Sequence, residues 1–399
     1  MNERTRENRQ LTKARLHAAV VLALLFLLAV STANSTELLN NWYSTRALGM
    51  GNAYTAVVDD ADALFYNPAA LQEISGVNWT VFDIHGGLNG QEAIDNAKLA
   101  EKIADDIAGT VEKLYGKRTW AGAGAKSAIS VPGFAAAVFG HADAGVVVSN
   151  PPNPMIQPNF IVDYGGAIGF AVPLIPKVAT IGLVGKRINR TGTTKALGGG
   201  TLASLDGESL KQEFKRRGTG YGLDLGAKFK LPGPVSPALT FVMRDIGYTA
   251  FTHEEGLGPP PRSEPEMVIG GSLQISAPLI TITPAFDFRY LNRSDVQLGK
   301  KINLGVEVDL PLLDLRVGLH QGYYTAGVGL DFALLRADVA TWGVELGEYP
   351  GQREDRRYMA QLTFEIGFDP FFFFGGSSSG GGGGAGGKSG ERRRLKQRR

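Results

Sequence analysis

The sequence contains no cysteine and only five histidines among its 399 residues. Without cysteine there is no disulfide framework and no thiolate metal site, and the scattered histidines lack the spacing typical of metal ligands. There is no Gly-x-Ser-x-Gly elbow, and no paired carboxylates stand out. We therefore expect no catalytic residue, no metal, no cofactor and no enzyme activity.

The chain also lacks a strong charge of either sign, because its formal net charge is only +2. Lysine and arginine gather in residues 1–17 and 388–399, which leaves the body between them mildly acidic. Proteins that bind nucleic acid present a basic patch on the folded domain. The composition therefore predicts no nucleic-acid partner.

Long apolar runs are absent apart from residues 18–30. This run is shorter than the roughly 20 residues that a membrane-spanning helix needs. It follows a basic stretch and precedes small residues at 33–35, with 31–33 as a rival cleavage site. We interpret residues 1–35 as a secretory signal peptide, with an uncleaved membrane anchor as the alternative.

The body of the chain is dominated by alternation of apolar and polar residues. In residues 280–290, Ile280 and Phe286 share one face, while Asp287 and Arg289 share the other. This period of two predicts β-strands, and we expect about fourteen of them, each of roughly 9–13 residues, a length that spans a bilayer when tilted. The strands are expected to start near 77, 119, 134, 159, 178, 219, 237, 265, 279, 301, 313, 324, 336 and 357.

The connections between these strands alternate between long and short, and only the short hairpin near residues 321–323 breaks the rhythm. A soluble β-sandwich also alternates, but strand length, loop rhythm and aromatic residues near strand ends favour an outer-membrane barrel. We therefore predict an all-β fold, a closed transmembrane antiparallel barrel over residues 77–368 in the bacterial outer membrane, with both termini periplasmic. The expected aromatic girdle includes Trp79, Trp120, Tyr164, Tyr221 and Trp342.

Charged residues on the polar face of the strands would line the lumen of this barrel. Because buried charges must be paired, we expect them to bind one another or something that fills the barrel. The predicted lumen-lining residues are Asp224, Lys228, Asp287, Arg289, Glu307, Asp309, Arg316 and Asp331.

Residues 36–76 precede the first strand and contain the stretch RALGMGNAYTAVVDDADALFYNPAAL. Gly49 and Gly51 permit close backbone approach. Pro68 disfavours helical geometry at Asn67, and Asn67 is suited to an Asx turn. We predict that this apolar, turn-rich segment starts on the periplasmic side and plugs the barrel.

This stretch resembles the FadL-like long-chain fatty acid channels and their PorV-type and TraF-like relatives, through its Gly-Met-Gly start and its Asn67-Pro68-Ala69 turn. The resemblance implies a fourteen-stranded barrel blocked by an N-terminal hatch, with Asn67, Pro68 and Ala69 in the hatch and Gly49 and Gly51 nearby. It also implies hydrophobic ligands that bind near the extracellular side and leave laterally. The turn either helps to gate the hatch or only lets it fit.

Two further segments depart from a simple barrel. Residues 91–116 carry apolar residues at helical spacing, and by strand parity this helical insertion is extracellular. It serves as a lid for an apolar ligand or merely packs on the barrel rim. Residues 369–399 form a Gly/Ser-rich basic tail, expected to be disordered, which is either passive or a tether to a periplasmic anionic or protein partner.

These features predict a passive outer-membrane channel for hydrophobic or amphipathic small molecules such as long-chain fatty acids. Its partners would be the outer-membrane lipid and the hydrophobic ligand. The alternative is a non-transporting barrel that serves as a scaffold for protein secretion, surface attachment or conjugation.

Overall fold

The computed structural model describes residues 37–38, 42–90, 118–149, 155–198, 207–332 and 334–368. The predicted signal peptide at 1–35, the helical insertion at 91–116 and the basic tail at 369–399 lie outside these residues. Among the described helices, none has both the length and the apolar character needed to cross a lipid bilayer.

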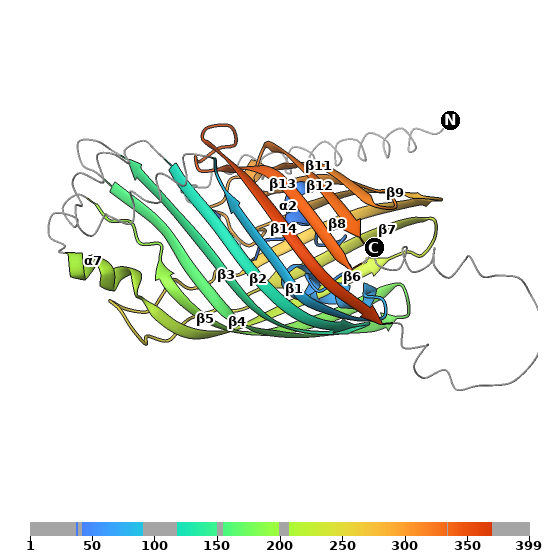
Figure 1. Cartoon of the computed structure of the whole chain (residues 1–399), viewed down its shortest axis with the longest axis horizontal. Helices are drawn as coiled ribbons and strands as arrows, with labels where there is room; N and C mark the ends of the chain where they lie inside the picture. Colours follow the sequence, from blue (N-terminus) through green and yellow to red (C-terminus); the bar gives the residue numbers. More distant parts are fainter. Residues whose placement is uncertain are drawn as a thin grey trace, which may run out of the picture.

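The described residues form one closed antiparallel barrel, in which each strand pairs with its sequence neighbours and β1 pairs with β14 (Figure 1). The closing register runs from Val77 opposite Phe368 to Leu88 opposite Tyr358. The strands are β1 (Val77–Leu88), β2 (Arg118–Val131), β3 (Phe134–Ser149), β4 (Met155–Ile175), β5 (Ala179–Thr193), β6 (Arg217–Lys230), β7 (Val235–Arg244), β8 (Glu266–Ala277), β9 (Ile280–Phe288), β10 (Ile302–Asp309), β11 (Leu313–His320), β12 (Tyr323–Phe332), β13 (Leu335–Glu345) and β14 (Glu354–Phe368).

The predicted closed barrel of about fourteen strands is confirmed, and so are the strand positions. The largest displacement is in β4, which begins at Met155 rather than near 159. Strand lengths vary more than expected: β4 has 21 residues, whereas β10 and β11 have 8 each. The wall formed by β2–β6 is therefore built from longer strands than the wall formed by β9–β11.

The connections divide the barrel into two ends. The short-turn end carries the tight turns, such as that at 132–133, together with the start of β1 and the end of β14. The long-loop end carries the other connections, including α7 (Gly207–Phe214) and α8 (Leu298–Lys301). The expected exception is present as well, because only Gln321 and Gly322 separate β11 from β12 at the long-loop end.

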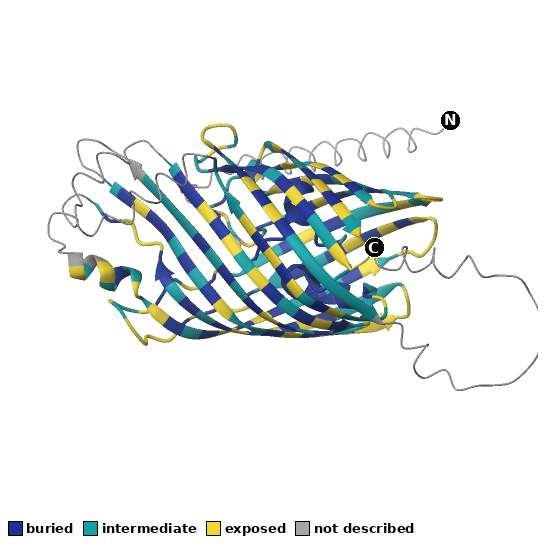
Figure 2. Ribbon diagram, viewed as in Figure 1, coloured by how far each residue is buried: buried dark blue, intermediate teal, exposed yellow. Residues whose placement is uncertain are grey.

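Burial alternates along the strands, as the stripes in Figure 2 show. Large apolar side chains such as Ile168 and Val138 are exposed on the outer face. The girdle prediction is wrong for Trp120 and Trp342, which are 1% and 0% exposed and pack with Tyr43 inside the barrel. Proximity to a strand end does not decide which face a side chain occupies, and these two occupy the inner one.

The lumen is filled by residues 42–76, which we call the lumen segment. It contains α2 (Thr45–Gly49), α3 (Ala63–Tyr66) and the 3-10 helix η1 (Pro68–Glu73). Its apolar side chains, among them Met50, Leu64 and Leu71, form the core of the protein together with inward residues of the wall. Helix α2 packs against β11–β14, whereas η1 packs against β3–β6, so the segment crosses the lumen.

The described N-terminal residues begin at the long-loop end. The Glu37 carboxylate accepts a hydrogen bond of 2.7 Å from Arg357, near the start of β14, and Leu38 packs with Tyr290 in a long loop. At the short-turn end, the Leu71 carbonyl accepts a hydrogen bond from the Gly133 N–H in the turn between β2 and β3. The described start of the segment, at Glu37, therefore lies at the barrel end opposite to the start of β1, and the prediction that the plug starts on the periplasmic side stays a prediction.

The two faces of β5 allow a direct test of how tightly the lumen segment fits. A Cβ atom on the inward Gly182 would lie 2.3 Å from the Pro68 carbonyl carbon, whereas one on the outward Gly185 would meet no atom within 4 Å. Gly182→Ala should destabilise the protein by about 1–3 kcal/mol, as overpacking does, and Gly185→Ala should not. Unfolding temperatures of the purified proteins in detergent measure this, and equal values for the two variants would contradict the fit.

Candidate functional site: the plugged lumen

The Asn67-Pro68-Ala69 turn is fully inside the barrel. Asn67 is extended, with φ −157°, and its Oδ1 accepts from the Ala69 N–H at 3.1 Å, while its Nδ2 donates to the Thr55 carbonyl at 2.8 Å. The turn lies against glycines of the wall, because a Cβ on Gly226 would lie 2.3 Å from Asn67 Oδ1. These contacts describe a turn that fixes where η1 starts.

Gly49 and Gly51 lie where the lumen segment approaches the opposite wall most closely. Gly51 has φ +65°, and a Cβ there would lie 2.4 Å from the Leu304 carbonyl oxygen. A Cβ on Gly49 would lie 3.0 Å from the Cα of Gly327. At Gly51 both the positive φ and the lack of space require glycine.

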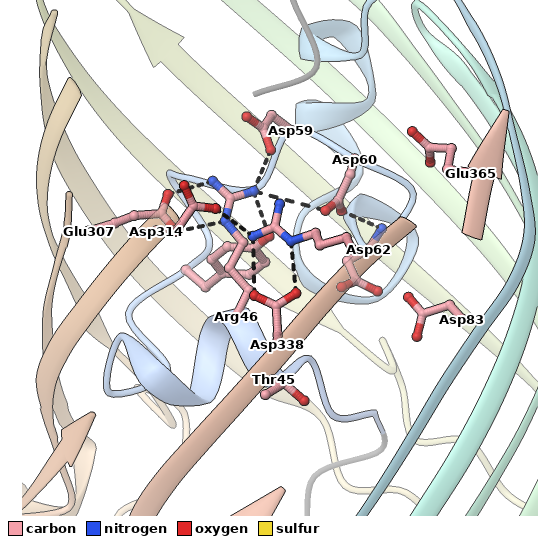
Figure 3. A network of polar contacts seen from close by, with 12 residues as sticks. Thr45, Arg46, Asp59, Asp60, Asp62, Asp83, Glu307, Asp314, Asp338 and Glu365 are labelled. Carbon is pink, nitrogen blue, oxygen red and sulfur yellow. Dashed lines mark hydrogen bonds and ion pairs between the residues drawn. The ribbon is translucent and has the colours of Figure 1, made fainter. Parts of the chain in front are cut away.

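Arg46 connects α2 to this wall through a buried ion-pair network (Figure 3). Its guanidinium donates to both carboxylate oxygens of Glu307, at 2.9 and 2.6 Å, and to Asp59 at 2.7 Å. Glu307 also accepts from Arg316 at 2.6 Å, so one carboxylate joins an arginine of the segment to an arginine of the wall. Arg316 in turn donates to Asp314 and Asp338.

Two further wall carboxylates hold the lumen segment. Asp287 accepts from the backbone N–H groups of Tyr54 and Thr55 and from the Thr55 hydroxyl, at 3.0, 3.1 and 2.6 Å. On the other side, Lys126 forms ion pairs with Asp62 of the segment and Asp83 of β1. The segment is therefore anchored to strands around the lumen rather than to one wall.

Of the predicted lumen residues, all except Asp331 are buried, and Asp331 is half-buried near the short-turn end. Glu307, Arg316 and Asp287 take part in anchoring the lumen segment. Others pair within the wall, as Asp224 does with Lys186 and Arg289 with Glu266. Arg46 and several buried charges on β1–β5 were not predicted from the sequence, although their alternation with outward residues is a signal. These charges are Asp83, Lys126, Asp143, Lys186 and Arg190.

A cavity of about 730 Å³ opens between the lumen segment and the long loops. Trp42, Phe65 and Phe139 form an aromatic surface along it, with Trp42 stacked on Phe65 at 4.6 Å between ring centroids. The cavity is also lined by charged pairs, including Arg190 with Asp163. It therefore offers one apolar region and one charged region.

His141 adds an unusual polar group to this cavity. Its side chain is 4% exposed and lies 6.3 Å from Trp42 between ring centroids. Neither of its ring nitrogens has a hydrogen-bond partner in the described part of the chain. The His141 ring therefore contributes to the wall of the cavity through its packing near Trp42.

A second cavity, of about 570 Å³, lies on the short-turn side of the lumen segment. Ala56, Val57 and Leu279 contribute apolar surface, and serine and threonine hydroxyls contribute polar surface. Lys228 and Lys230 also line it, and both approach Glu73, at 3.9 and 2.7 Å. The lumen segment thus separates two cavities that belong to opposite ends of the barrel.

Known structures share this fold. A TodX deletion mutant, a monoaromatic hydrocarbon channel, matches with a TM-score of 0.51 and 12% identity over 82% of this chain and 99% of its own. TodX and TbuX are FadL-family outer-membrane barrels. The chain has the fold of that family.

Two further structures match less closely. The toluene transporter TodX of Pseudomonas putida gives a TM-score of 0.48, with 11% identity over 84% of this chain and 100% of its own. The toluene transporter TbuX of Ralstonia pickettii gives 0.46, with 10% identity over 82% and 98%. Neither a family profile nor a curated protein matches the sequence.

The Arg46 network predicts how strongly the lumen segment is held inside the barrel. Arg46→Met leaves Asp59 without its cation and removes the ion pair between the lumen segment and Glu307. Breaking a buried pair costs about 3–5 kcal/mol. Chymotrypsin should then cut the detergent-purified protein faster at Tyr54 and Phe65. Arg262→Met is the control, because Arg262 pairs with Glu264 on the exposed surface, where ion pairs contribute little. An unchanged cutting rate in Arg46→Met would show that the network does not hold the segment.

The ion pairs of Glu73 with Lys228 and Lys230 predict that the stability of the folded protein depends on pH. Burial by itself raises the pKa of Glu73, but Lys228 and Lys230 outweigh it and lower the pKa from its ordinary 4.5. A lowered pKa stabilises the fold above the unfolded-state pKa, and this stabilisation is lost as the pH falls through the lowered value. Glu73→Gln should therefore lower the unfolding temperature at pH 7 and have a smaller effect at pH 3. An equal effect at both pH values would show that the ionised Glu73 carboxylate does not stabilise the fold.

Proposed function

We propose that this protein is an outer-membrane channel for passive uptake of hydrophobic or amphipathic small molecules, with residues 36–76 acting as its hatch. The observation that carries the proposal is the lumen segment between two cavities of about 730 and 570 Å³, one towards each end of the barrel. A barrel with a ligand-sized space on each side of a plug is suited to stepwise passage. The fold similarity to a hydrocarbon channel supports the same class of cargo.

The lining of the larger cavity favours an amphipathic cargo over a plain hydrocarbon. Trp42 and Phe65 can contact an apolar tail, while charged residues such as Arg190 and Asp163 can contact a polar group. Long-chain fatty acids combine both features. In the proposed orientation the long-loop end faces outward, and the end of β14 lies on the periplasmic side.

The absence of native cysteine permits a clean test of hatch movement. The hydroxyl oxygens of Thr55 in the hatch and Thr240 in β7 lie 3.0 Å apart, which is close enough to consider a disulfide between cysteines at these positions. A Thr55→Cys, Thr240→Cys variant should take up labelled oleate only when reduced, in a Gram-negative host without its own fatty acid channel. The single variant Thr240→Cys should take it up under both conditions.

The outcome also separates the two candidate functions. If the full chain reaches the outer membrane and neither oleate nor toluene enters above the level of an empty vector, the channel proposal fails. A scaffold is then favoured if the full chain captures periplasmic proteins and a chain without residues 369–399 does not.

A further inference from the structure

The outer wall of the barrel has a groove of about 820 Å³ that runs over β1–β6. Its outward residues alternate between large and small across the strands: Ile129 pairs with Ala136, Ala136 with Ile168, and Ile168 with Gly185. Ile129 and Ile168 are both 53% exposed. The small residues thus form the floor of an apolar groove between larger side chains.

Arg187 lies in this groove on the outward face of β5. It pairs with Gly166 on one side and with Tyr221, which is 72% exposed, on the other. At about 3.3 Å per residue it lies about 33 Å along the strand from the turn at Lys177. For a strand tilt of about 35–45° this is roughly 23–27 Å along the barrel axis. An outer-membrane barrel has an apolar band about 25 Å tall, so Arg187 is near the boundary of that band on the long-loop side.

The guanidinium of Arg187 is exposed and has no carboxylate within ion-pair distance among the described residues. Other outward arginines differ in this respect. Arg356, on β14, pairs with Glu354 and lies over the Tyr324 ring at 3.9 Å. An unpaired arginine facing lipid is costly unless it reaches a charged partner at the interface.

The surroundings of Arg187 favour an anionic partner. Arg217 is also exposed, further towards the long loops, but its Nη2 donates to the Tyr164 hydroxyl at 2.8 Å and its Nε lies 4.0 Å from a Glu254 carboxylate oxygen. Tyr164 and Tyr221 are both exposed on the same outer face. Arg187, which has no such carboxylate among the described residues, lies with Tyr164 and Tyr221 at one edge of an apolar groove. This arrangement matches a ligand that has phosphate at one end and acyl chains at the other.

We propose that this groove binds one phosphorylated glycolipid of the outer leaflet, the lipid A part of lipopolysaccharide. Arg187 contacts a phosphate, and an acyl chain lies over Gly166 and Gly185. The outer leaflet is the source because Arg187 lies towards the long loops, which face outward in the proposed orientation. The site needs the barrel to face lipid, but it does not need the lumen to conduct.

Binding of lipid A to the full chain in detergent tests this proposal by native mass spectrometry. Arg187→Gln should weaken binding about fivefold, the effect of roughly 1 kcal/mol for one cation near a membrane surface. Gly185→Leu should also weaken binding by filling the groove, and a Cβ at this position meets no atom within 4 Å. Lipid A without its phosphates should bind the parent protein as weakly as phosphorylated lipid A binds Arg187→Gln.

The controls keep the same chemistry elsewhere on the outer face. Arg356→Gln removes an outward arginine that has its own acidic partner, and Gly86→Leu fills an outward glycine whose Cβ also meets no atom. Both should bind lipid A as the parent does. Equal binding by Arg187→Gln and the parent, or equal binding of phosphorylated and dephosphorylated lipid A, would overturn the proposal. Uptake of oleate is a separate measurement, so either proposal can fail alone.

Discussion

The hydrogen-bond ladder between β1 and β14 is the constraint on which the rest of the structure depends. In lipid an unpaired strand edge leaves backbone N–H and C=O groups unsatisfied, at a cost of several kcal/mol each. The pairing from Val77–Phe368 to Leu88–Tyr358 removes that edge. Closure also creates an interior, and the charged side chains that line it need either water or protein groups as partners.

The lumen segment meets this second requirement. Glu307 lies between Arg46 of the segment and Arg316 of the wall, and Asp287 receives backbone donors from Tyr54 and Thr55. Many charges of the lumen are therefore anchors for the segment rather than the lining of an open aqueous pore. The wall supplies the space for this contact through inward glycines such as Gly182 and Gly226.

The two faces of the same strands carry different chemistry because successive side chains point to opposite sides. In β5, Lys186 and Arg190 point inward and are buried in ion pairs, whereas Gly185 and Arg187 point outward. The inner face of β4–β5 borders the larger cavity, and the outer face forms the groove. The proposed channel and the proposed lipid site therefore use opposite faces of this wall, and Lys186 is the one described residue that lines both the larger cavity and the groove.

The sequence by itself determined the strands, their approximate starts and which residues of β6–β12 point into the lumen, because a period of two is a local property of the chain. It also determined the turn at Asn67, since the effect of Pro68 is local. Only the tertiary structure decided that Arg46 binds Glu307, that Trp120 and Trp342 point inward to Tyr43, and that the segment runs from the long-loop end. Arg46 and Glu307 are 261 positions apart in the sequence, and what brings them together is the closure of the barrel around the segment, which no local pattern encodes.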